Sequence, residues 1–236
     1  MNKEEFIKKC KDLNIEIDEE LYNKFMIYYT TLVEWNNKFN MTAIIKKEDV
    51  FLLHFYDSLC LIKAVELKDN LSLCDFGTGA GFPGIVLSIV FNNLKVTLVE
   101  SNKKKCLFLE TIKNKLNLKN IIIINDRVEN YSKNNREKFD IVTCRAVTSI
   151  PIILELSTSL LKINGLLVPL KSNCSEEIEK YEYLEKELGI KLIDKVIYNL
   201  PINNANRTIP IYKKLFLTPL KYPRNYNVML KEYKNK

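Results

Sequence analysis

Histidine is almost absent from this chain of 236 residues. The single His54 and the lack of any G-x-S-x-G motif exclude an α/β-hydrolase built on a Ser-His-Asp triad. Zinc sites made of several histidines are excluded for the same reason, and we expect no bound metal. The six cysteines include no C-x-x-C pair, so neither a disulfide framework nor a zinc ribbon is predicted.

Long hydrophobic runs and a secretion signal are also missing. The longest apolar stretch, 82–91, falls short of the roughly 20 residues that a bilayer span needs, and it contains Pro83 and Gly84. The first ten residues alternate charged with single apolar side chains, which is not typical of a signal peptide. We therefore expect no membrane association and a cytoplasmic location.

The charge is unbalanced towards the basic side, with a net value of +7. An excess of this sign suits a polyanionic partner, because phosphate contacts dominate the affinity of proteins for nucleic acids. A solvated basic surface explains the excess equally well, so the charge alone does not decide. Arginine is rare and occurs at positions 127, 136, 145, 207 and 224.

The hydrophobic pattern changes near residue 67. Before it, two segments have helical spacing, with Asp18 as a natural N-cap. After it, β-like runs at 71–76, 95–100, 121–125, 139–144 and 165–171 alternate with helical patterns at 82–91, 102–116, 150–161 and 175–188. This alternation predicts an α/β fold with a parallel sheet covered by helices on both faces.

Two further runs, 190–199 and 207–217, have no helix between them and predict an antiparallel pair at one sheet edge. We thus predict seven strands, mostly parallel. We also predict two segments in one body: an N-terminal helical extension, residues 1–67, packed on a core domain, residues 68–236.

A glycine-rich turn follows the first predicted strand. It reads Asp75-Phe-Gly-Thr-Gly-Ala-Gly-Phe-Pro-Gly84, with a proline where a helix would begin. Gly77, Gly79 and Gly81 let the backbone turn tightly and approach a ligand, and the helix N-terminus behind them offers amide hydrogens. An ordinary βα turn explains one such glycine but hardly four in eight positions, so the turn predicts a nucleotide-type cofactor.

Two nucleotide cofactors fit this turn. Residues 79–84 match G-x-G-x-x-G, and Glu100 lies about 20 residues further on, where a ribose-binding acid is expected, so an NAD(P)-dependent oxidoreductase remains an alternative. Asp75 favours S-adenosylmethionine, because a carboxylate suits its cationic aminoacyl group better than a pyrophosphate. The chain also lacks a second α/β half that would carry a nicotinamide. Glu100 could accept both ribose hydroxyls.

The turn and residues 98–109 resemble the glucose-inhibited division protein B family, bacterial methyltransferases that modify guanine N7 in 16S ribosomal RNA. The resemblance extends, in the family's order, to residues 35–44, 54–59, 127–129, 140–147, 170–171 and 222–224. It therefore covers nearly the whole chain. One departure is Ser172, where the family often has glycine. The resemblance implies a Rossmann-like, S-adenosylmethionine-dependent methyltransferase fold.

The resemblance also implies which residues bind. It places cofactor contacts at Gly77, Phe82, Val128, Glu129 and Arg145, and it makes Arg145 the residue that orients the cofactor or the guanine. Together with the turn, the predicted cofactor-binding residues are Asp75, Gly77, Gly79, Gly81, Phe82, Glu100, Val128, Glu129 and Arg145.

The implied partner is 16S ribosomal RNA, free or in the small ribosomal subunit, acted on by a monomer. Guanine N7 carries a lone pair and no proton, so orientation suffices and no general base is expected. The base must be unpaired or flipped out, because N7 is unreachable in a deep A-form groove. Lys171 and Arg207 are RNA-binding candidates. Trp35 and His54 are expected to pack the helical extension on the sheet, with base stacking as the alternative. A methyltransferase on another RNA and a non-catalytic RNA-binding protein remain alternatives.

Overall fold

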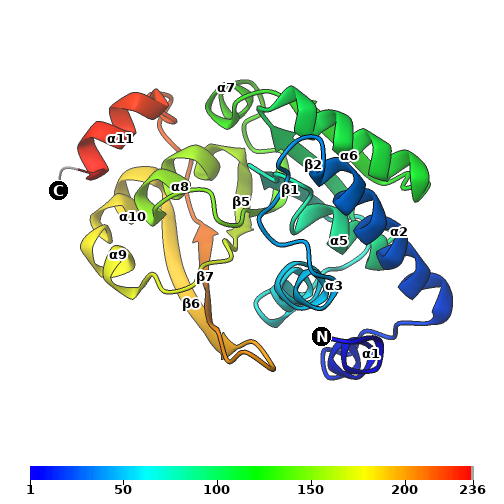
Figure 1. Cartoon of the computed structure of the whole chain (residues 1–236). Coiled ribbons are helices and arrows are strands. Elements are labelled where there is room, and N and C mark those ends of the chain that lie inside the picture. The colour runs from blue at the N-terminus through cyan, green and yellow to red at the C-terminus, as the bar shows by residue number, and fades with distance from the viewer. Residues whose placement is uncertain (235–236) are drawn as a thin grey trace.

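Neighbouring residues of the central strands face opposite sides of the sheet in the computed structural model, which describes residues 1–234 (Figure 1). In β1 (Ser72–Phe76), Leu73 belongs to one hydrophobic cluster and Cys74 to the other. Leu98 and Val99 of β2 (Lys95–Glu100) are divided in the same way. This period of two buries both faces of the sheet under helices.

The strand order is β3-β2-β1-β4-β5-β7-β6. The first five strands in sequence run parallel, and they include β3 (Ile121–Asn125), β4 (Phe139–Thr143) and β5 (Leu161–Leu167). β7 (Asn206–Lys214) is antiparallel to both β5 and β6 (Ile190–Asn199). The predicted mostly parallel sheet with an antiparallel edge is confirmed.

The fifth strand differs from its predicted bounds. It begins at Leu161, which pairs with Phe139, and it ends at Leu167 rather than at residue 171. Residues 162–164 are exposed, so the start of the strand is not part of the buried apolar run from which the strand was predicted. Leu170 and Lys171 still form single bridges with Arg145 and Thr208.

One face of the sheet is covered by α5 (Gly84–Val90), α6 (Lys103–Lys115) and the N-terminal helices α1 (Lys3–Lys11) and α2 (Glu19–Asn36). The Asp18 side chain accepts a hydrogen bond from the Leu21 amide, which confirms the predicted N-cap. Aromatic residues of the N-terminal helices, such as Phe25 and Phe55, share one hydrophobic cluster with the sheet. The boundary at residue 67 stays a prediction.

Residues Lys47 to Lys63 form one helical stretch of changing pitch. α3 (Lys47–Val50) continues into a π-helical turn, η1 (Phe51–Tyr56), then into α4 (Asp57–Leu59) and a 3-10 turn, η2 (Cys60–Lys63). π-helical turns are rare in proteins, and those that do form are frequently found at functional sites. Here the turn carries His54 and leads directly into Asp57.

The other face of the sheet is covered by α7 (Val128–Asn134), α8 (Ile150–Ser157), α10 (Tyr183–Leu188) and α11 (Tyr226–Lys234). The 3-10 turn η3 (Thr158–Leu160) follows α8, and α9 (Ser175–Lys180) precedes α10 as a separate helix, so the predicted helix 175–188 is in fact two. Arg224 donates to the fully buried Glu155 and so anchors the C-terminal segment. Residues 235–236 of the predicted core domain lie outside the described residues.

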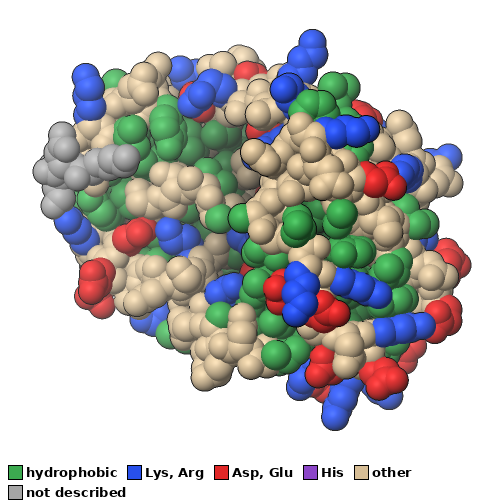
Figure 2. Space-filling view, viewed as in Figure 1, with side chains coloured by type: hydrophobic (Ala, Val, Ile, Leu, Met, Phe, Trp, Pro, Cys, Tyr) green, Lys and Arg blue, Asp and Glu red, His purple; other side chains and the backbone are tan. Residues whose placement is uncertain are grey.

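Basic side chains are dispersed over the face of the molecule seen in Figure 2. Figure 2 shows Lys and Arg around one face, with apolar side chains gathered between α7 and α11. The net positive charge is therefore not collected into one patch on this face. Within residues 1–234, no helix is both long and apolar enough to cross a membrane.

Candidate functional site

The glycine-rich turn lies at the carboxyl edge of the sheet, where β1 sits between β2 and β4. Chain order reverses at this point, and open α/β sheets bind ligands in the crevice formed there. Gly81 has a φ of +98°, and a Cβ on it would lie 2.5 Å from the Tyr28 hydroxyl oxygen. That hydroxyl donates to the Ala80 carbonyl, so α2 packs directly against the turn.

Gly79 is different, because none of the described residues beyond its two chain neighbours fills the space beside it. Its φ is +62°, and a Cβ there would lie 4.0 Å from the nearest atoms outside its two chain neighbours, the Gly77 carbonyl oxygen and Lys105 Nζ. The glycine therefore leaves room for a ligand beside the backbone.

Replacing Gly79 with alanine is expected to weaken S-adenosylmethionine binding about tenfold or more, because the methyl group would enter this space. The left-handed backbone costs about 1–2 kcal/mol, so a modest fall in melting temperature is also expected. Calorimetric titration and thermal melts measure both. Gly81→Ala is the contrasting variant and should lose far more stability, because its Cβ meets Tyr28. Cofactor affinity unchanged in Gly79→Ala would contradict this use of the space.

Asp75 lies behind the turn and is fully buried. Its Oδ2 accepts from the Thr78 hydroxyl at 2.6 Å and from the Gly84 amide at 2.8 Å. Its Oδ1 has no hydrogen-bond partner within residues 1–234, and a buried acceptor left unpaired costs free energy. Burial raises the pKa of Asp75 to about 7. Asp75 thus holds the turn, and its contact with the cofactor stays a prediction.

This raised pKa implies a pH-dependent stability. The native state keeps the Asp75 proton until pH about 7, whereas a carboxyl at the ordinary value of 3.8 releases it much earlier. Between these values the native state binds more protons than the unfolded chain, so this group lowers the free energy of unfolding as pH rises. Urea melts from pH 5 to 8 should show that the stability of wild type relative to Asp75→Asn falls with pH. A flat difference would refute the raised pKa.

Glu100 ties the end of β2 to the turn. Its Oε2 accepts from the Gly79 amide at 2.9 Å, and its Oε1 accepts from the Asn102 amide at 2.8 Å. The residue is 7% exposed. Each carboxylate oxygen can accept a second hydrogen bond, so the predicted contacts to ribose hydroxyls remain compatible with this geometry.

A cavity of about 520 Å³ opens beside the turn. The structure brings six of the predicted residues into its lining: Gly77, Gly79, Phe82, Arg145, Lys171 and Arg207. The other five do not line it: Asp75, Gly81, Glu100, Val128 and Glu129. Val128 packs in the hydrophobic cluster on the α8 side of the sheet, and Glu129 accepts from Arg127 Nε at 2.5 Å. A second cavity, of about 590 Å³, lies around Gly189 and Phe216 and contains none of the predicted residues.

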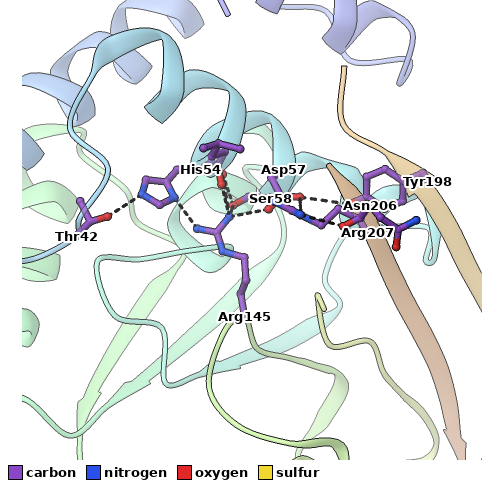
Figure 3. Close-up of polar contacts among 9 residues, drawn as sticks. Thr42, His54, Asp57, Ser58, Arg145, Tyr198, Asn206 and Arg207 are labelled. Atoms are coloured by element: carbon purple, nitrogen blue, oxygen red, sulfur yellow. Dashed lines mark hydrogen bonds and ion pairs between the residues drawn. The ribbon is translucent and has the colours of Figure 1, made fainter. Parts of the chain in front are cut away.

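Arg145 lines the cavity and points towards the helical stretch that carries His54 and Asp57 (Figure 3). Its Nη1 donates to the Leu53 carbonyl at 3.0 Å, and its Nη2 contacts His54 Nδ1 at 3.0 Å. Its guanidinium carbon lies 5.0 Å from the centre of the Phe82 ring, within the range of a cation–π contact. Arg145 is therefore part of a built site, and its side chain is only 13% exposed.

His54 also belongs to this site, although the sequence favoured packing of the helical extension over base stacking. Its ring stacks on Phe82 at 4.4 Å between centres, and its Nε2 lies 3.0 Å from the Thr42 hydroxyl. Burial and the neighbouring Arg145 lower the pKa of His54 to about 3, so the ring is neutral. Because Arg145 can only donate, Nδ1 accepts and Nε2 carries the proton that His54 donates to Thr42.

Thr42 and Asp57 were missed by the sequence reasoning. Both line the cavity. The available signal was their position within residues 35–44 and 54–59, two of the segments that resemble the family. Within the described part of the chain, no three His, Cys, Asp or Glu side chains are placed to hold a metal ion.

Comparisons with known proteins agree with this geometry. Residues 21–199 match the model of the GidB family, described as rRNA small subunit methyltransferase G. A relative named ribosomal RNA small subunit methyltransferase G, from Oceanobacillus iheyensis, is 40% identical over 235 residues, which cover 98% of this chain and 99% of the relative. The chain belongs to this family. A relative of the same name from Staphylococcus saprophyticus is 42% identical over 212 residues, which cover 89% of each chain.

Solved structures agree on the fold of this GidB family member. The crystal structure of a SAM-dependent methyltransferase from Aquifex aeolicus has a TM-score of 0.52 at 18% identity, and the match covers 72% of this chain and 94% of that one. M. jannaschii TYW2, solved in complex with AdoMet, has a TM-score of 0.51 at 18% identity, with 62% and 68% covered. The predicted Rossmann-like fold is confirmed. Because it belongs to this family, the chain is an S-adenosylmethionine-dependent methyltransferase. The alternative, an NAD(P)-dependent oxidoreductase, is therefore not favoured.

The residues present fit this cofactor. The turn offers open space beside Gly79 and an unpaired buried acceptor on Asp75, and Glu100 keeps acceptor capacity next to both. A cationic aminoacyl group and a ribose require acceptors of this kind. Which of these atoms contacts the cofactor stays a prediction.

Proposed function

We propose that this GidB family member transfers a methyl group to N7 of a guanine in 16S ribosomal RNA. The observation that carries the proposal is the cavity beside the glycine turn, because its lining joins glycines of the cofactor turn to basic side chains. Four basic side chains line it: Lys105, Arg145, Lys171 and Arg207. The names of the relatives, which specify the RNA of the small ribosomal subunit, support the same substrate.

The side chains of the cavity suit a reaction that needs orientation. S-adenosylmethionine supplies an electrophilic methyl group on a sulfonium sulfur. Guanine N7 has a lone pair and no proton, so the chain needs no base, and His54 is neutral and already engaged with Thr42 and Arg145. Arg145 keeps its Nε–H without a partner in residues 1–234 and could hold the base or a phosphate.

Lys171 and Arg207 are the RNA-binding residues of this proposal. Lys171 Nζ donates to the Thr148 carbonyl at 3.0 Å and lies 3.4 Å from Glu177, so these two contacts fix it in the cavity lining.

We propose further that the enzyme acts as a monomer in the cytoplasm, where the small ribosomal subunit is assembled and used.

The test is transfer of labelled methyl from S-adenosylmethionine to 16S ribosomal RNA from cells that lack this protein. Free RNA and small-subunit particles are tried separately, and the product is mapped to a nucleotide and an atom. Methyl on N7 of one guanine supports the proposal. Methyl at another atom or in another RNA, or no transfer despite tight cofactor binding, contradicts it.

A further inference from the structure

Asp57 is the one carboxylate among the described residues that line the cavity. A free carboxylate there would repel the phosphates of an RNA. Asp57 is only 2% exposed, and both of its oxygens face arginine side chains. The carboxylate is therefore paired with these two arginines and is not available to a ligand.

Three distant segments meet at this carboxylate (Figure 3). Asp57 begins α4, Arg207 lies on β7, and Arg145 follows β4. Oδ1 accepts from Arg207 Nε at 3.0 Å and from the Tyr198 hydroxyl at 3.4 Å. Oδ2 lies 3.4 Å from Arg145 Nη1. The shorter contact, to Arg207, is the one that fixes an arginine most directly.

Arg207 retains donors after these contacts are made. Its Nε is used by Asp57 and its Nη1 by the Asn206 carbonyl, while its Nη2 has no partner within residues 1–234. The side chain is 19% exposed and reaches the cavity. A guanidinium held at two of its nitrogens presents the third in a fixed direction, which suits a phosphate oxygen.

We propose that Asp57 is a positioning residue that holds the Arg207 guanidinium in the orientation that binds an RNA phosphate beside the target guanine. This inference rests on the proposed function. A free arginine side chain loses rotamer freedom when it binds, so fixing it beforehand lowers the cost of binding. Asp57 does not itself contact the RNA. Its effect therefore falls on RNA affinity and not on the cofactor.

The first variant is Asp57→Asn, which keeps the shape of the side chain and removes its charge. Loss of one charge-assisted hydrogen bond predicts RNA binding about tenfold weaker. We expect this change in filter binding of a 16S ribosomal RNA transcript to the protein without cofactor, and the same factor in KM for the RNA. Calorimetric affinity for S-adenosylmethionine should stay within about twofold. RNA affinity equal to wild type would overturn the proposal.

A double-mutant cycle separates positioning from a merely structural role. Arg207→Ala alone should weaken RNA binding by at least as much as Asp57→Asn. If Asp57 acts through Arg207, adding Asp57→Asn to Arg207→Ala should change RNA affinity by less than about twofold. A structural role predicts instead that the two losses multiply, and that result would also overturn the proposal.

Arg207→Lys keeps the inference testable if Asp57→Asn does not fold. Lysine keeps the charge but lacks the planar group that Asp57 holds, so we expect RNA binding nearly as weak as in Arg207→Ala. Wild-type affinity in Arg207→Lys would contradict positioning. Failure of the wild-type protein to transfer methyl to 16S RNA would contradict the proposed function. If the wild type transfers methyl normally but Asp57→Asn and Arg207→Lys bind RNA as tightly as it does, only this inference is contradicted.

Discussion

Replacing Arg145 with alanine is expected to lower kcat/KM for methyl transfer to 16S ribosomal RNA by about 10²–10³-fold, the range seen when one preorganised donor is removed from an active site. Arg145 lies between the glycine turn and the N-terminal helices, with its guanidinium over the Phe82 ring and its Nη groups on Leu53 and His54. No other cationic side chain among the described residues of the cavity makes contacts with Phe82 and His54 together.

The Arg145 variants must be separated from loss of structure. Truncation leaves the Leu53 carbonyl without this donor, so Arg145→Ala should also lower the melting temperature. Arg136→Ala is the matched control, because Arg136 likewise donates to backbone carbonyls, those of Thr218 and Tyr222, but lies outside the cavity. Arg136→Ala should lose stability and keep its transfer rate.

Arg145→Lys provides a second measure of the same role. Lysine keeps the charge but cannot reach Leu53 and His54 with a planar fork, so it should recover only a small part of the lost rate. Single-turnover measurements with saturating cofactor and RNA report the chemical step directly. If Arg145→Ala lost no more activity than Arg136→Ala at matched stability, Arg145 would have no role in orienting the reactants.

The sheet could be predicted from the sequence because its signals are local. Strands such as β2 carry apolar residues on both faces, and the β6–β7 pair is recognisable because no helix separates its two runs. The short helices α7 and α11 escaped prediction, because seven to nine residues give little periodicity and their burial depends on α8. The start of β5 was missed for a different reason, because residues 162–164 are exposed and do not extend the buried apolar run of the strand.

The candidate site likewise contains residues that a local sequence motif predicts and residues that only the folded chain brings together. The glycine turn and Glu100 are a local motif, so their position at the end of β1 and β2 follows from the sequence. The contacts of Asp57 with Arg145 and Arg207 join residues 88 and 150 positions apart, and no local pattern encodes them. The π-helical turn at Phe51–Tyr56 adds to the difficulty, because it shifts the helical register just before Asp57. Val128 and Glu129, placed by family resemblance, lie outside the cavity lining.

The second large effect is expected at Glu100. Replacing it with alanine should weaken S-adenosylmethionine binding about 10–100-fold, because hydrogen bonds to charged groups contribute about 1.5–3 kcal/mol each. The carboxylate accepts from the Gly79 and Asn102 amides, so its loss frees the turn from the end of β2 and also removes the predicted acceptor for the ribose. Calorimetric titration of the cofactor measures the change.

Two further variants distinguish the carboxylate's charge from its general effect on the fold. Glu100→Gln keeps one carbonyl acceptor but points an amide donor at one of the two backbone N–H groups, so an intermediate loss of affinity is expected. Glu110→Ala, on the same helix that Asn102 caps, removes a carboxylate away from the cavity and should bind the cofactor as wild type does. Unchanged affinity in Glu100→Ala would contradict the assignment.

Because Glu100 also fits a dinucleotide turn, NAD is titrated in parallel with S-adenosylmethionine. Since the chain belongs to a methyltransferase family, the wild type should bind S-adenosylmethionine far more tightly than NAD.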